Sequence, residues 1–229
     1  MIYITGDTHG DIGRFKSKAV RRLKKQDYLI ICGDFGFVWD GSKPEQKQLA
    51  WIAKRRFTTL FLDGVHENRR LLDTYPQEEK FGGSVRRLGQ RLFLLERGQV
   101  FTIDGKRIFA MGGGESDESV VQDTLDITWP EDLPTTKEIV DAANRLAEVD
   151  YQVDYVVTYE AATTIKNAMN IRQNTINPLN TFLDRVMRRC TYQRWFFGCY
   201  HIDRKLSGTH RAVFKDVVPI EQDGKTTAK

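Results

Sequence analysis

Carboxylates and imidazoles follow several short apolar runs of this 229-residue chain. The run Ile2–Thr5 is followed by Asp7 and His9, and the run Tyr28–Cys32 is followed by Asp34. His66 follows a third apolar run, Phe57–Leu62, and further along the chain His201 comes three residues after Gly198, where another run ends. Glycines stand beside most of these side chains, which allows the backbone to crowd around a small ligand.

This set of residues predicts a metal centre. Side chains two residues apart on an extended segment point to the same side, so Asp7 and His9 are expected to face one ligand together. Mixed carboxylate and imidazole donors favour a divalent transition ion such as Mn, Fe, Zn or Ni over calcium. One Asp-x-His triplet alone is more typical of a structural loop. The repetition of such residues at successive strand ends favours the metal interpretation.

The elements that must position these residues alternate between strand and helix. Strands are predicted over 2–5, 28–32 and 57–62, with helices over 14–25 and 44–56 between them. This alternation is typical of a parallel sheet, whose carboxyl-terminal loops usually carry the ligand site.

The middle of the chain has a different pattern. Short strands are predicted over 84–88, 91–95, 100–103 and 107–111, and Asp104-Gly105 indicates a hairpin turn. The run Gly112–Gly114 is expected to be a tight turn, with a phosphate-binding loop as the alternative. Residues 115–133 are expected to be an acidic, irregular loop.

The last third of the chain returns to alternating helices and strands. A capping box at Thr135–Glu138 opens a predicted helix that ends near residue 149. A strand over 154–158, a helix over 178–189, a strand over 194–198 and a hairpin or strand pair within 205–218 complete the predicted elements. We expect one domain over residues 1–220 and a polar, disordered tail over 221–229.

Composition narrows the cellular setting and the partners. The net charge of +4 does not oppose a phosphate-bearing partner. Basic doublets are spread along the chain, which is typical of solvated helix faces, with a nucleic-acid-binding stripe as the alternative. The three cysteines lack a disulfide spacing, which favours a reducing, cytoplasmic location. No run approaches the roughly 20 apolar residues that a membrane span needs, so no membrane partner is expected.

The order of these motifs resembles the calcineurin-like metallophosphoesterases. The resemblance rests on Asp7-x-His9, Gly33-Asp34, Gly64-x-His66-Glu67, the strand that ends at Tyr159, and Gly198-x-x-His201, and it extends from Met1 to about Val218. It implies an α/β fold, a four-layer α/β/β/α sandwich of two mixed sheets flanked by helices. It also implies hydrolysis of phosphomonoesters or phosphodiesters at a two-metal centre.

Carried over to this chain, the resemblance implies that Asp7, His9 and His201 hold the first metal and that Asp34 bridges to the second. The family's ligands for the second metal are replaced by Val65, Tyr159 and Cys199. We therefore predict one tightly bound ion. Val65 and Tyr159 are expected to fill the vacated pocket with apolar groups. The alternative is a rebuilt second site that uses the Cys199 thiolate or Glu160.

His66 is the predicted catalytic residue. In the family this histidine lies near the leaving group, as a general acid or a phosphate ligand, and imidazole suits that task at neutral pH. The alternative is a loop histidine that only hydrogen-bonds Asp7 or Asp34.

Two functions follow from these motifs. The first is a metal-dependent phosphoesterase of weak or one-metal activity, acting on a small phosphate ester, a nucleotide or a nucleic acid. The second is a catalytically inactive relative that serves as a binding or regulatory module and has a protein partner.

Overall fold

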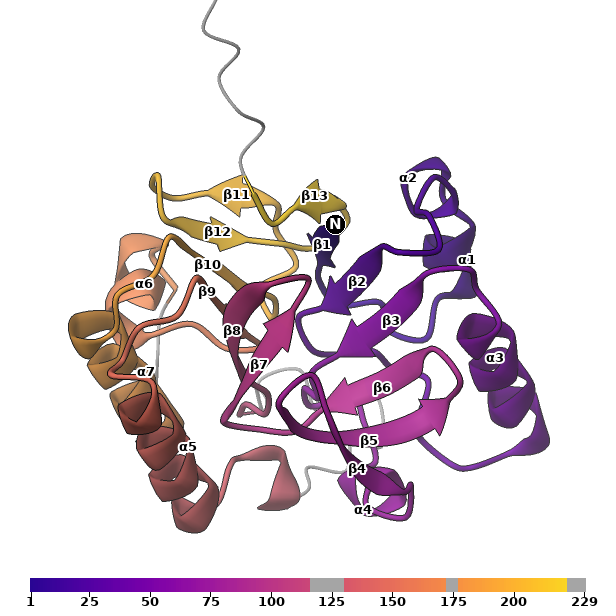
Figure 1. Cartoon of the computed structure of the whole chain (residues 1–229), viewed down its shortest axis with the longest axis horizontal. Coiled ribbons are helices and arrows are strands. Elements are labelled where there is room, and N and C mark those ends of the chain that lie inside the picture. Colours follow the sequence, from indigo (N-terminus) through magenta and orange to yellow (C-terminus); the bar gives the residue numbers. More distant parts are fainter. Residues whose placement is uncertain (116–129, 172–176, 222–229) are drawn as a thin grey trace, which may run out of the picture.

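Two mixed sheets form the centre of the computed structural model, which describes residues 1–115, 130–171 and 177–221. The sheets pack face to face, and helices cover both outer sides (Figure 1). The predicted four-layer α/β/β/α fold is therefore confirmed. The tail predicted over 221–229 lies outside the described residues except for Glu221, and so does most of the predicted acidic loop over 115–133.

The first sheet carries the three apolar runs that lead into the predicted metal ligands. Strands β1, β2, β3 and β6 are parallel to one another, and the other strands are antiparallel to their neighbours. The order across this sheet is β13 (Val218–Pro219), β1 (Ile2–Thr5), β2 (Tyr28–Ile31), β3 (Thr58–Phe61), β6 (Leu92–Leu95), β5 (Gly83–Gly89) and β4 (Gln77–Lys80).

The second sheet brings the strand that ends at Tyr159 beside the strand that leads to His201. Strands β8, β9, β10 and β12 are parallel, and β7 and β11 are antiparallel edge strands. The order is β11 (Arg204–Lys205), β12 (His210–Ala212), β10 (Arg194–Phe197), β9 (Tyr155–Thr158), β8 (Lys106–Met111) and β7 (Gln99–Ile103).

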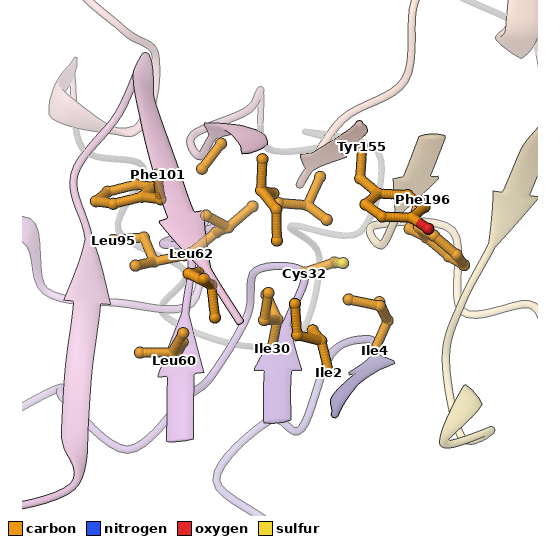
Figure 2. Close-up of a cluster of buried hydrophobic side chains, with 14 of the residues drawn as sticks. Ile2, Ile4, Ile30, Cys32, Leu60, Leu62, Leu95, Phe101, Tyr155 and Phe196 are labelled. Carbon is orange, nitrogen blue, oxygen red and sulfur yellow. The ribbon is translucent and has the colours of Figure 1, made fainter. Parts of the chain in front are cut away.

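Apolar side chains between the sheets form the central core. Alternate residues of β1, β2 and β3 face this core, because successive side chains of a strand point to opposite sides. Figure 2 shows Ile2, Ile4, Ile30, Leu60 and their neighbours packed toward the side chains of the second sheet. The intervening residues, such as Leu29 and Ile31, pack against the helices on the outer side.

Helices complete the outer layers. Those beside the first sheet are α1 (Ile12–Lys16), α2 (Lys18–Arg21), α3 (Lys43–Ala53) and α4 (Arg69–Leu72). Those beside the second sheet are α5 (Thr136–Glu148), α6 (Thr163–Ala168) and α7 (Pro178–Arg189). The capping box at Thr135 and Glu138 is formed, and the helix predicted over 178–189 has the predicted bounds.

The continuous helix predicted over 14–25 is wrong. The chain leaves the helical conformation at Ser17, where ψ is 153°, and the Ser17 hydroxyl accepts the N–H of Val20 to begin α2. Serine is favoured at a helix N-cap because its side chain can take over an orphan N–H. The segment is therefore two short helices, and residues 22–27 turn toward β2. The prediction also missed α4, α6 and β4, which are short.

Candidate metal centre

The loop after β1 is held tightly against the loop after β2. The N–H groups of Thr8 and His9 both donate to the Asp34 carbonyl, at 2.8 and 2.9 Å. The guanidinium of Arg14 in α1 donates to the carbonyls of Asp7 and Gly6, at 3.0 and 3.2 Å. The Asp7 side chain is fully buried. The sequence pattern did not predict that Arg14 would hold this loop by hydrogen bonds to its carbonyls.

Asp7, His9 and His201 converge although they come from opposite ends of the chain. Nε2 of His9 lies 2.8 Å from Nε2 of His201, which in turn lies 3.8 Å from Oδ2 of Asp7. One donor atom from each of the three residues falls within 4.8 Å of the others. The two imidazole side chains are 32% and 50% exposed, so the cluster opens to solvent on the histidine side.

The surroundings of the Asp7 carboxylate are suited to a bound cation. Its Oδ1 accepts the N–H of Cys199 at 3.1 Å, but its buried Oδ2 has no hydrogen-bond partner in the part of the chain that the structure describes. Burial, with the negative charge of Asp34, raises the pKa of Asp7 to about 7. A buried carboxylate without enough donors is unfavourable unless a positive charge is supplied. An ion between Asp7, His9 and His201 would supply that charge.

Asp34 lies beside this cluster and is saturated with hydrogen bonds. Oδ1 accepts the N–H groups of Val65 and His66, at 2.8 and 3.1 Å. Oδ2 accepts from Nδ1 of His66 at 2.8 Å and from the hydroxyl of Tyr159 at 3.0 Å, and Nε2 of His9 lies 4.0 Å away. Burial favours the neutral acid, but the hydrogen bond and charge of His66, with those of the other donors, lower the pKa of Asp34.

Tyr159 is more than an apolar filler. Its ring lies between Gly33 and Gly114, where a Cβ on either glycine would come within 2.2 or 2.7 Å of ring carbons. This placement brings the hydroxyl to Asp34 Oδ2, on the carboxylate that was predicted to bridge two ions. Burial raises the pKa of Tyr159 well above its usual range, so the group stays a neutral donor. The prediction of a purely apolar pocket was wrong for Tyr159.

The other residues near the second ion's position offer little to a metal. Val65 contributes only its backbone N–H, which donates to Asp34. Desolvation, followed by the charge of Glu160, raises the pKa of the Cys199 thiol well above its usual range, which disfavours a thiolate. Glu160 is turned to a buried ion pair with Lys166 and accepts the Asn180 amide at 2.7 Å. Val65, Tyr159 and Cys199 therefore do not reproduce the family's ligands for a second ion, although His9, Asp34 and His66 form a second group of side chains that could hold one.

Several residues of the centre have strained backbone conformations. His9, Asp34, Cys199 and His201 have positive φ angles of 46°, 45°, 70° and 51°. Such left-handed conformations are uncommon for residues other than glycine, and they gather at functional sites where the surrounding fold enforces them. Sequence reasoning gave no signal for this strain.

Two buried acids outside the predicted ligand set hold the loops in place. Glu67 accepts the N–H groups of Gly36 and Gly64, both at 2.6 Å, and so ties the loop after β2 to the loop after β3. Asp63 at the end of β3 pairs with Arg97, whose Nη2 lies 2.6 Å from Asp63 Oδ2. Arg97 and Arg69 hold the pKa of Asp63 low in spite of its burial.

The Gly112–Gly114 run continues β8 as irregular chain, and no turn is formed there, so the predicted tight turn is wrong. The N–H groups of Gly113 and Gly114 donate to the carbonyls of Asp63 and Asp132, at 2.9 and 3.0 Å. A Cβ on Gly112 would lie 2.1 Å from Oδ1 of Asp63, so only glycine fits there. With these two N–H groups engaged, the alternative of a phosphate-binding loop is not supported.

The fold and the loops that carry the candidate ligands agree with a match to a known protein family. The family model for calcineurin-like phosphoesterase matches residues 1–190. The chain therefore belongs to the calcineurin-like phosphoesterase family. The matched range includes Asp7, His9, Asp34 and His66 but ends before Cys199 and His201, whose place in the centre follows from the geometry above. No curated protein gives a significant match to the chain.

Membership of the family identifies a phosphoesterase-like protein with a candidate metal-ligand cluster. In the described part of the chain, no helix has the length and apolar character needed to cross a membrane.

Proposed function

We propose that this protein hydrolyses a phosphate ester with one tightly bound divalent transition ion, held by Asp7, His9 and His201 with Asp34 at the edge of the site. The single observation that carries the proposal is the asymmetry around Asp34. On one side lies a buried Asp7 oxygen among imidazole nitrogens, and no hydrogen-bond partner for it lies within the described ranges. On the other side the hydroxyl of Tyr159 donates to Asp34 Oδ2.

The ion and the chain have separate tasks in this proposal. A divalent ion bound here supplies positive charge to the phosphoryl oxygens and Lewis-acid activation. Beside the metal ligands, the chain supplies the half-exposed imidazole of His66 at the opening, and this group orients a phosphate group. The substrate class that fits is a small phosphate ester or a nucleotide.

His66 is the proposed catalytic acid. Its Nδ1 lies 2.8 Å from Asp34 Oδ2, so Asp34 fixes the tautomer that carries the proton on Nδ1. Nε2 is then the atom that can transfer a proton to the leaving oxygen. Asp34 also stabilises the imidazolium that must exist before that transfer, as a carboxylate partner does in other histidine dyads.

Activity against phosphodiesters and phosphomonoesters with Mn, Ni, Co and Zn tests the proposal. The control for contaminating phosphatases is Asp7→Asn with His9→Gln, prepared in parallel. We expect hydrolysis by the wild type that this double variant lacks. Equal rates in the two preparations would refute the proposed enzyme.

A change of leaving group tests the role of His66. General acid catalysis contributes about 10²–10⁴-fold, and an ester whose leaving group is already acidic does not need it. We expect His66→Gln to slow hydrolysis of an alkyl ester by about that factor, to spare a nitrophenyl ester, and to leave metal content unchanged. Equal losses on both esters would contradict the acid role.

The saturation of Asp34 also favours a second candidate function, a binding or regulatory module without catalysis. A missing second ion removes charge stabilisation from the transition state, which is a loss of several kcal/mol. This candidate predicts nucleotide or phosphopeptide binding in Mn buffer by calorimetry, with no turnover above the double variant. Turnover that depends on Asp7 and His9 would exclude it.

We also propose a cytoplasmic location. Support comes from the cysteines, since Cys32, Cys190 and Cys199 are all unpaired, as is usual in a reducing compartment.

A further inference from the structure

Basic residues from three separate segments meet on one outer side of the first sheet. The guanidinium of Arg56 donates to the carbonyls of Leu23 and Arg21, and that of Arg91 donates to those of Lys25 and Arg56. We call the resulting surface the basic face. It comprises Lys16, Lys18, Arg21, Arg22, Lys24, Lys25, Lys54, Arg55, Arg56 and Arg91.

The basic face lacks compensating acids. Among the described residues, none of its ten side chains forms an ion pair with a carboxylate. The acids of the α1–α2 and α3 segments are Asp11, Asp27 and Glu45. Asp27 and Glu45 are buried, and all three carboxylates accept backbone N–H groups. A single-sign surface of this kind attracts a polyanion.

The basic face is remote from the metal centre along the sheet. Residues 21–25 lead into β2, residues 54–56 lead into β3, and Arg91 precedes β6, so these residues lie at the amino ends of parallel strands. The metal ligands follow the carboxyl ends of β1 and β2. In Figure 1, α1, α2 and α3 line the outer side of the first sheet, away from the second sheet. The face therefore serves a purpose other than holding the reacting phosphate.

Two of its guanidinium groups are already oriented. The carbonyl contacts of Arg56 and Arg91 fix these side chains at the surface, which reduces the entropy cost of binding a phosphate. Trp51 is partly buried, and cations already lie against its ring, with the Arg55 guanidinium 3.7 Å and the Lys16 ammonium 5.8 Å from the ring centroid. The face thus offers donors for phosphates without an open aromatic surface on which bases could stack, as single-strand binders use.

A membrane surface fits the basic face less well. Peripheral membrane segments combine basic residues with apolar side chains that enter the lipid. The exposed large hydrophobic side chains of the described chain are Met1, Trp39 and Val140, and none belongs to the basic face.

We propose that the basic face binds the phosphate backbone of a double-stranded nucleic acid without sequence preference. The contacts come from the lysines and arginines of the α1–α2 segment, the end of α3 and the turn before β6. This inference does not depend on hydrolysis at the metal centre, and it holds for either function proposed above.

Fluorescence anisotropy with a short labelled DNA duplex, and with the RNA duplex of the same sequence, tests the proposal. The face variant carries Arg21→Gln, Arg22→Gln, Lys24→Gln and Lys25→Gln. The matched control removes four exposed cations elsewhere, with Arg185→Gln, Arg188→Gln, Arg204→Gln and Lys205→Gln. Both lose the same net charge, and their melting temperatures and metal contents show whether they fold as the wild type does.

We expect the wild type and the control to bind a duplex alike, and the face variant to bind at least tenfold more weakly. The slope of log K against log salt, between about 50 and 200 mM, should become shallower by about 0.9 for each phosphate that the face variant no longer neutralises. Equal binding by the face variant and the control would overturn the proposal. So would absence of duplex binding at low salt, tighter binding to an unpaired strand, or stronger binding to phosphatidylcholine–phosphatidylserine vesicles than to the duplex.

Discussion

Removal of the Tyr159 hydroxyl tests the idea that a hydrogen bond has replaced an ion. In Tyr159→Phe the ring keeps its place between Gly33 and Gly114, so apolar burial is unchanged. Asp34 Oδ2 loses the donor at 3.0 Å and keeps only the one from His66. The carboxylate is 1% exposed, so water cannot readily replace the missing donor.

The expected effect is a clear loss of stability. A hydrogen bond to a charged group contributes about 1.5–3 kcal/mol, and 1 kcal/mol shifts the melting temperature of a domain this size by about 2–4 °C. We expect Tyr159→Phe to lower the melting temperature by about 3–12 °C in chelator-treated buffer. Metal content should stay at one ion, because phenylalanine adds no ligand.

Thermal unfolding followed by circular dichroism measures this loss. The matched control is Tyr155→Phe, whose hydroxyl donates to a neutral amide oxygen of Gln193 at 3.3 Å near the surface, so a smaller effect is expected. A Tyr159→Phe protein as stable as the wild type would refute the reasoning and restore the view of Tyr159 as apolar filling.

Three further predictions concern the metal and the buried charges. Mn at 100 times its dissociation constant should stabilise the wild type by about 2.7 kcal/mol, and Asp7→Ala with His9→Ala should abolish that shift in melting temperature. Restoring the family's ligands should create a second ion site and speed hydrolysis at least tenfold, about 1.4 kcal/mol of barrier, whereas single replacements should do little. That variant carries Val65→Asn, Tyr159→His and Cys199→His. Asp63→Asn should cost about 3–5 kcal/mol at pH 7, because it leaves Arg97 buried without its carboxylate. The folded-state pKa of Asp63 lies below its unfolded value, so its contribution is present above about pH 4 and is lost as the pH falls through the folded pKa. Denaturant titrations across this pH range should therefore show a steeper acid loss in the wild type than in Asp63→Asn.

Much of the fold could be predicted because its signals are local. The apolar runs of β1, β2 and β3 are bounded by glycine and polar residues, and the capping box and Pro178 mark where α5 and α7 begin. The parallel arrangement then forces the residues that follow these strands to one edge. This is why Asp7, His9 and Asp34 could be picked out as candidates from their places after the strands, while their roles as metal ligands came from the family resemblance.

What the sequence could not reveal depends on long-range contacts. The Tyr159 hydroxyl donates a hydrogen bond to Asp34, which lies 125 residues earlier in the chain, and neither residue type predicts this bond. Glu160 was a reasonable substitute ligand until its partners Lys166 and Asn180 were known. The basic doublets illustrate the same point, because three of them gather on one face while Arg69 is drawn into a pair with Glu96.

The number of ions bound per chain tests the central claim most directly. Protein purified without chelator, and the same protein after incubation with Mn, should be weighed by native mass spectrometry and analysed by elemental mass spectrometry. The account predicts one ion per chain in both samples, and none after Asp7→Ala with His9→Ala. Two fully occupied ions per wild-type chain would contradict it. Asp34 would then bridge to a second ion, on the side where the account places the Tyr159 hydroxyl instead of an ion.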